Sequence, residues 1–235
     1  MLPHRSTVLG VQIDMLRRGW PEQILTGRYS FATRRRDGLV QGLFEAVDLL
    51  TDGLIDKKRK RRLHLRIGGE PAMLVLKETY PQSPHLPPGI KLCGASPVAA
   101  LLVLCERRAY RPSSAVSLFE PYHYDVVDHR LGVVIGTLEA TGGFVRPART
   151  VIYGPSQQVL GQLTQPVTAL IGQWLLIGRN RYDVTVNGVR VARIQQVRRI
   201  WVREYQVDVS AAAGLLDPRL ILACALQKVR DLGDY

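Results

Sequence analysis

The sequence has few cysteines and no apolar run long enough to span a membrane. Three cysteines occur among 235 residues, at positions 93, 105 and 224, with no close pair spacing. This sparse and odd set argues against a disulfide framework and favours a reducing compartment. The N-terminus has no apolar signal core, and no apolar run approaches the roughly 20 residues of a spanning helix. We therefore expect a cytoplasmic chain, without a transmembrane span, that can lie at a membrane surface.

The signatures of common enzymes are also absent. The sequence contains no Gly-rich phosphate loop, no dinucleotide fingerprint, no G-x-S-x-G elbow and no H-E-x-x-H pair. Nothing places a nucleophile beside a base, so we expect neither enzyme activity nor a cofactor. Two histidines and two aspartates lie near one predicted hairpin, but their spacing matches no metal motif. We expect no metal site there and interpret the four as polar turn residues: His123, Asp125, Asp128 and His129.

Positive charge is in clear excess. The net charge is +12 and the pI about 10.1, which favours acidic partners such as phospholipid headgroups or nucleic acid, although such charge also keeps a soluble protein dispersed. A run of six cations can bind anionic lipid, nucleic acid or an import receptor, or serve as a solvated lead-in to a strand. The run consists of Lys57, Lys58, Arg59, Lys60, Arg61 and Arg62.

Residues 1–62 differ in pattern from the rest of the chain. Pro21 is typical of a helix start, and residues 39–50 place their apolar side chains on one helical face between two glycines. From Leu63 onward short apolar and alternating runs indicate strands. Residues 98–105 are continuously apolar and fit either a buried strand or a buried helical turn. We predict a helical basic segment over 1–62 and one β domain over 63–235.

Three hairpin patterns follow one another in the second half of the sequence. They span residues 124–138, 150–163 and 182–194, and each ends in an aliphatic, small, polar, aliphatic sequence. Asn187-Gly188 is the strongest turn signal among them. The small residues predict bends or the close approach of another backbone, as barrel corners require: Gly136, Gly161 and Ala192. Serial hairpins predict an antiparallel sheet, and closing that sheet removes its exposed edges.

The C-terminal region predicts a buried helix over residues 215–229. Asp217 is a good N-cap, and Pro218 follows at the first helical position, where its missing N–H costs nothing. Residues 220–226 are apolar on every face, so the helix must be surrounded by protein or lipid. The run is too short to cross a bilayer, and this favours burial in protein. An alternating half-buried strand over 201–209 leads into it.

This order of motifs resembles the tubby C-terminal-like superfamily, which includes phospholipid scramblases and LURP-one-related proteins. The matching stretches are residues 184–194, 201–209 and 216–226, the last fitting a D-x-[KR]-L-x-x-A-x-x-L helix. The resemblance implies a mainly β fold, a closed antiparallel barrel of about twelve strands threaded by the apolar helix.

The resemblance also implies a function. Tubby-type domains bind phosphoinositide headgroups through a Lys/Arg site on the barrel, and scramblases act on membranes with calcium. This chain has no cysteine cluster for acylation and few acids before its last helix, so the calcium site is not carried over. We expect binding of anionic phospholipid; the alternatives are a scramblase-like activity and a nucleic-acid or protein adaptor. The arginines expected to meet the headgroup, unless they form only a scattered solvated surface, are Arg190, Arg193, Arg198, Arg199 and Arg203.

Overall fold

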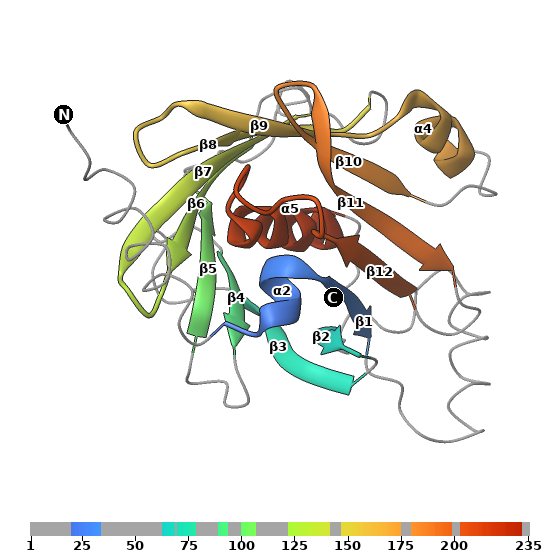
Figure 1. Ribbon diagram of the computed structural model, residues 1–235. Coiled ribbons are helices and arrows are strands. Elements are labelled where there is room, and N and C mark those ends of the chain that lie inside the picture. Colours follow the sequence, from blue (N-terminus) through green and yellow to red (C-terminus); the bar gives the residue numbers. More distant parts are fainter. Residues whose placement is uncertain are drawn as a thin grey trace, which may run out of the picture.

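Twelve antiparallel strands form a closed barrel around a helix in the computed structural model (Figure 1). The structure describes residues 20–33, 63–68, 70–78, 89–93, 100–106, 122–141, 147–174, 180–198 and 203–231. The mainly β fold class, the closed barrel and the C-terminal helix inside it are confirmed. The strands are β1 (Arg28–Thr33), β2 (Leu63–Ile67), β3 (Glu70–Glu78), β4 (Gly89–Cys93), β5 (Ala100–Glu106), β6 (Tyr122–Asp128), β7 (Val133–Thr141), β8 (Arg149–Tyr153), β9 (Val159–Thr164), β10 (Arg181–Val186), β11 (Val189–Arg198) and β12 (Arg203–Asp208).

Consecutive strands are neighbours around the barrel, and β1 closes it by pairing with both β12 and β2. The barrel therefore begins within residues 1–62, earlier in the chain than the predicted boundary at residue 63. Residues 98–105, which fit either a strand or a helix by pattern, contribute β5. The predicted helix over residues 39–50 lies outside the described residues.

The helix α5 (Pro218–Asp231) occupies the centre of the barrel. Its residues from 220 to 226 are all buried, as an all-round apolar segment requires, and Gln227 and Lys228 after them are buried as well. Asp217 caps it as predicted, because its Oδ1 accepts a hydrogen bond from the Arg219 N–H at 2.9 Å. The helix begins at Pro218 rather than at Leu215, because the Leu215 N–H bonds back to the Ala212 carbonyl in a preceding turn.

Two short helices complete the described fold. The helix α2 (Glu22–Thr26) follows Pro21, as predicted, and packs against α5 with Ile24 and Leu25 buried in the common core. The helix α4 (Val167–Trp174) connects β9 to β10. Because Ile24 and Leu25 belong to the same buried cluster as the apolar residues of α5, α2 extends the core that surrounds that helix.

A β-bulge recurs in every second hairpin. In each case the register skips one residue of the hairpin's second strand, and a bulge of this kind bends the strand and increases its twist. In the last three hairpins the skipped residue directly precedes the small residue at which a bend is predicted. The skipped residues are Ala72, Leu101, Ile135, Leu160 and Val191. The regular bulges supply the curvature that lets the sheet close.

The glycine next to the bulge in β7 also makes room for α5. A Cβ on Gly136 would lie 2.5 Å from the Tyr153 carbonyl oxygen and 2.8 Å from Cδ2 of Leu220 on the central helix. A Cβ on Gly161 would lie 2.6 Å from the Thr185 carbonyl oxygen. The predicted close approach of another backbone is therefore present at both glycines.

The barrel has two distinct ends. We call one of them the tip end: it carries the turns 129–132, 154–158 and 187–188 and the loop 209–217 that enters α5. Asn187 and Gly188 form their turn with φ of 49° and 78°, as the Asn-Gly signal predicts. We call the other the α4 end: it carries α4, the junction between β11 and β12, and the start of β2. Because neighbouring strands are antiparallel, every odd-numbered strand runs from the tip end towards the α4 end.

Candidate functional site

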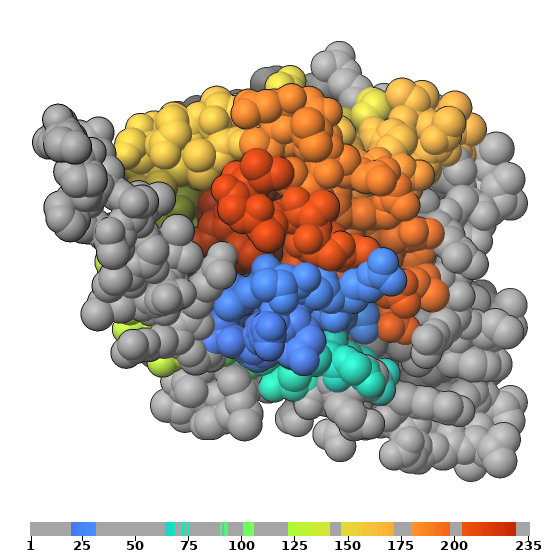
Figure 2. All heavy atoms as spheres, in the orientation of Figure 1, coloured from blue at the N-terminus to red at the C-terminus, as the bar shows by residue number. Residues whose placement is uncertain are grey.

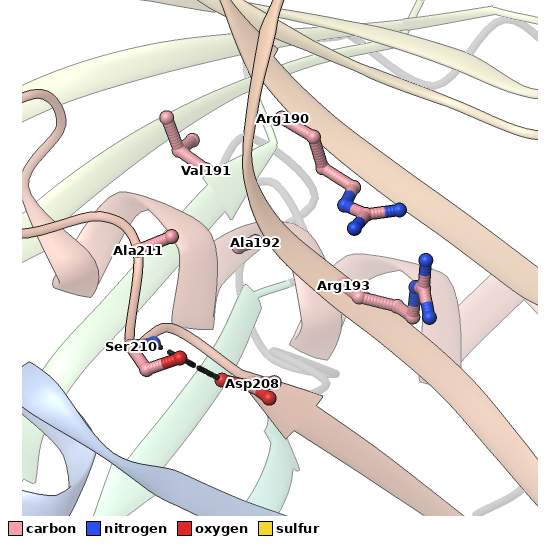
Figure 3. Close-up of a pocket in the computed structure, with 7 residues that line it drawn as sticks. All are labelled: Arg190, Val191, Ala192, Arg193, Asp208, Ser210 and Ala211. Atoms are coloured by element: carbon pink, nitrogen blue, oxygen red, sulfur yellow. Dashed lines mark hydrogen bonds between the residues drawn. The ribbon is translucent and has the colours of Figure 1, made fainter.

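An open hollow lies where the chain leaves β12 near the tip end (Figure 3). The pairing of β11 with β12 ends at Arg193 and Asp208. Beyond this point β11 stays paired with β10, whereas the segment that follows β12 turns away towards α5. The divergence leaves a hollow of about 160 Å³ lined by Arg190, Val191, Ala192, Arg193, Asp208, Ser210 and Ala211.

The bulge at Val191 brings two of the predicted arginines to the same face of the barrel. Side chains alternate between faces along a strand, so residues three apart normally point to opposite faces. The extra residue of the bulge shifts the alternation by one, so that both arginines point outwards. Arg190 pairs with Thr185 and Arg193 with Asp183, both on the outer face of β10. Figure 3 shows both guanidinium groups on the same side of β11.

Arg193 belongs to a row of alternating charges. In register, Arg28, Asp208, Arg193 and Asp183 follow one another across four strands. The Arg28 Nε lies 2.7 Å from Asp208 Oδ2, and the Arg193 Nε lies 3.2 Å from Asp183 Oδ1. Asp183 is shared with Arg181, whose Nη2 lies 2.9 Å from Oδ2. Arg28 is largely exposed, so its pair contributes only about 0–1 kcal/mol to stability. Asp183 is more buried, but it divides its two oxygens between Arg181 and Arg193, and the remaining nitrogens of Arg193 can contact another group.

Arg190 differs from the other arginines of this surface. It is exposed, and within the described part of the chain it has no hydrogen-bond or ion-pair partner. A guanidinium carries five N–H donors in a planar fork that fits the oxygens of a phosphate. Arg190 with its whole fork, and Arg193 with the nitrogens that do not contact Asp183, can therefore bind one anionic group between them.

Asp208 makes the opposite wall of the hollow acidic. Its Oδ1 accepts hydrogen bonds from the Ser210 hydroxyl at 2.6 Å and from the Ser210 N–H at 3.1 Å. Burial alone would raise the pKa of Asp208, but these hydrogen bonds and the Arg28 guanidinium outweigh it and lower that pKa below its ordinary value. Asp208 is thus charged at neutral pH and already neutralised by Arg28, so an anion is favoured on the arginine side only.

The other predicted arginines lie elsewhere. Arg198 ends β11 and stands directly opposite Arg203, the first residue of β12, at the α4 end. Arg198 lies five positions beyond Arg193 along β11, a distance of about 16 Å at the usual rise per residue. The expected cluster is thus divided between two ends of one hairpin because its members follow an extended chain. Arg199 and residues 57–62 lie outside the described residues.

The polar cluster near the β6–β7 hairpin has structural contacts. Asp125 Oδ1 accepts a hydrogen bond from the Thr137 hydroxyl at 3.2 Å, and Asp128 is buried against Arg219. His123 and His129 lie at opposite ends of β6 and its turn. Within the described ranges no group of three or more His, Cys, Asp or Glu side chains is arranged to hold a metal ion.

Sequence reasoning did not identify Asp208, Ser210 and Ala211 as part of the site. They line the hollow only because the chain turns into α5 at this point, and no residue pattern marks where two paired strands diverge. The available sequence signal was Ala192, which aligns with Gly136 and Gly161 in the earlier hairpins. A bulge directly precedes each of these small residues, and the one before Ala192 brings Arg190 and Arg193 to the same face.

Comparison of the chain with protein-family models, with curated proteins and with solved structures gives no match. None of the helices in the described ranges combines the length and the apolar character needed to cross a membrane. The resemblance to the tubby-like superfamily therefore stays a prediction that rests on the sequence motifs.

Proposed function

We propose that this protein is a tubby-like barrel that binds anionic phospholipid headgroups without catalysing a reaction. The binding surface is the arginine side of the hollow, formed by Arg190 and Arg193. One observation carries the proposal: the Val191 bulge brings both guanidinium groups to one face beside an open hollow, and one of them lacks a partner among the described residues. The closed barrel around an apolar helix supports the family part of the proposal.

The expected strength of this site is modest. A basic side chain near an anionic membrane surface contributes about 1 kcal/mol to attraction. Two arginines together then account for a change in affinity of at least about tenfold, since 1.4 kcal/mol corresponds to one decade. Because exposed charges are screened over about 8 Å at physiological ionic strength, binding should also weaken as salt is added.

Sedimentation with phosphatidylcholine vesicles, with and without phosphatidylserine or phosphoinositide, tests the proposal. Arg190→Ala/Arg193→Ala should weaken binding to anionic vesicles about tenfold or more, whereas Arg149→Ala, which removes one exposed charge from β8, should change it little. Binding by the double variant at the level of the wild type would contradict the proposed site. A wild type that ignores anionic vesicles would reject the lipid proposal altogether.

Two further variants locate any vesicle binding that does not depend on Arg190 and Arg193. Arg198→Ala/Arg199→Ala tests the α4 end of the hairpin, and alanine at 57–60 tests the basic run. If only alanine at 57–60 removes vesicle binding, the basic run is the membrane anchor and the proposed barrel site is wrong. If none of the variants matters, the adaptor alternative is preferred, and nucleic-acid binding by the basic run becomes the next measurement. A fluorescent-lipid flip assay separates binding from the scramblase-like alternative.

A further inference from the structure

Among the described residues, the tip end of the barrel carries most of the large apolar side chains that face solvent. Nine such side chains are exposed in the described part of the chain, and six of them lie in or beside the tip-end turns. The other three, Tyr122, Val167 and Ile171, lie at the α4 end. The six at the tip end are Leu131, Val133, Val134, Val159, Val189 and Leu215.

These six side chains come from four separate segments. Each of the three hairpins from β6 to β11 contributes, and so does the loop that enters α5. Single exposed apolar residues are common on any protein, but their concentration at one end of a barrel marks an interaction surface. Figure 2 shows three of these segments on one face: the red-orange loop that leads into α5 lies centrally, with the orange β10–β11 turn above it and the yellow β8–β9 turn to its upper left.

The charge of the tip end indicates which kind of partner binds this surface. The tip-end segments 129–132, 154–158, 187–188 and 209–217 contain one acidic residue, Asp217, and its carboxylate is held by the buried Arg219. Exposed arginines stand directly beside two of the apolar tips: Arg130 precedes Leu131, and Arg190 follows Val189. Apolar side chains next to cations fit an anionic bilayer, where the former reach the acyl chains and the latter stay with the phosphates. A bilayer also accepts side chains at any lateral spacing, whereas a protein partner needs a matching pocket for every projecting turn.

We infer that the tip end is the membrane-docking surface of this protein. Its apolar side chains enter the boundary between headgroups and acyl chains of an anionic bilayer, while Arg130 and Arg190 remain among the phosphates. The inference rests on the proposed headgroup binding and adds an orientation to it: the barrel meets the membrane with its hairpin tips first. The α4 end, with Arg198 and Arg203, then faces away from the lipid.

Matched serine variants at the two ends test this orientation. Val159→Ser/Leu215→Ser removes tip-end side chains that are 65% and 55% exposed, and Val167→Ser/Ile171→Ser removes α4-end side chains that are 60% and 48% exposed. Sedimentation with phosphatidylcholine–phosphatidylserine vesicles should show at least a tenfold loss of binding for the tip-end variant and less than a twofold change for the α4-end variant. Equal losses for both variants, or no loss for either, would overturn the inference.

A fluorophore that reports on solvent polarity measures insertion directly. It is attached to Val159→Cys or to Val167→Cys in a Cys105→Ala background, because Cys93 and Cys224 are buried. On addition of the same anionic vesicles, emission from position 159 should shift to the blue and be quenched by spin-labelled acyl chains, whereas emission from position 167 should not change. A probe at 159 that stays in water while the protein is bound would contradict insertion.

A soluble ligand separates this inference from the proposed function. Binding of inositol phosphates by the wild type should be lost in Arg190→Ala/Arg193→Ala and retained in Val159→Ser/Leu215→Ser. If both variants still bind inositol phosphates like the wild type, only the arginine site is contradicted. The vesicle and fluorophore results then decide separately whether the tip end inserts into the membrane. If instead the wild type self-associates in sedimentation velocity, and the tip-end serines abolish that association without affecting vesicle binding, the tip end is a protein interface and the inference is wrong.

Discussion

The Arg219 Nη1 lies 2.6 Å from Oδ2 of Asp128, a residue 91 positions earlier in the chain, and both side chains are buried. Arg219 stands in the first turn of α5 and Asp128 at the end of β6, so the ion pair attaches the central helix to the barrel wall. The other oxygen of Asp128 accepts hydrogen bonds from the N–H groups of Arg130 and Leu131. The same carboxylate therefore holds both the helix and one of the apolar turns of the tip end.

Arg219 is held by a second carboxylate as well. Its Nη2 lies 2.6 Å from Oδ2 of Asp217, the residue that caps α5. Burial by itself would lower the pKa of Arg219, but the hydrogen bonds and charges of Asp217 and Asp128 raise that pKa above its ordinary value. Arg219 is therefore charged inside the barrel, and the D-x-R portion of the helix motif has a structural explanation.

Removing Asp128 should be far more damaging than removing a surface charge. Asp128→Ala leaves the buried Arg219 with only one carboxylate, and breaking a buried pair costs about 3–5 kcal/mol. Urea unfolding should show a loss of about that size, against about 0–1 kcal/mol for Arg28→Ala, whose pair with Asp208 is exposed. A loss below about 1 kcal/mol for Asp128→Ala would show that the ion pair does not attach the helix to the barrel.

The central position of α5 predicts a sharp contrast between two alanine sites. Ala223 is fully buried in α5, so Ala223→Asp should abolish soluble expression, because an unpaired buried carboxylate costs several kcal/mol. Ala213 is exposed in the preceding loop, and Ala213→Asp should express normally. Soluble yield and circular dichroism of the two variants compare them directly, and a normally folded Ala223→Asp would contradict the central-helix architecture.

The bulge glycines predict a second stability difference. Gly136→Ala should destabilise the fold by about 1–3 kcal/mol, because its Cβ would collide with the Tyr153 carbonyl and with Leu220. At the equivalent position of a later hairpin, Ala192→Gly should cost only about 0.5–1 kcal/mol of backbone entropy. Thermal unfolding of both variants provides the comparison. A fully stable Gly136→Ala would mean that β7 and α5 are not packed as closely as described.

The thiols should differ strongly in reactivity. Burial raises the pKa of the Cys224 thiol to about 12, while Cys105 is only partly buried. The raised pKa favours the protonated thiol in the folded state, so its contribution to stability is complete below about pH 8.5, the unfolded value, and decreases as pH rises towards 12. Labelling with a disulfide reagent near pH 8 should modify Cys105 first, and Cys224 only after urea is added. Rapid labelling of Cys224 in the folded protein would contradict its burial.

The sequence predicted the fold well because its main signals are local. Asp217-Pro218 marks the start of α5, the Asn187-Gly188 turn fixes one hairpin, and the small residues mark the corners at which the sheet bends. The strand β1 is not predicted: its residues fall in the segment expected to be helical, because its pairing partners, β12 and β2, are distant in sequence. Long-range pairing of this kind has no local pattern.

The site was predicted only in part, for a related reason. The composition of the hairpin shows that arginines are dense there, but not which of them share a face. That depends on one bulge residue, Val191, which reverses the alternation and brings Arg190 into line with Arg193. The apolar tips were not predicted either, because a valine that begins a strand has the same pattern whether it is buried or exposed.

The most direct test of the account is an NMR titration of arginine side-chain Nε–Hε signals with inositol phosphates at low salt. The account predicts that the signals of Arg190 and Arg193 shift together and saturate with one affinity, that the Arg149 signal does not change, and that added salt reverses the shifts. Titration in which Arg190 and Arg193 stay unperturbed, while other arginines shift or none does, would contradict the claim that this hollow binds a phosphate-bearing headgroup.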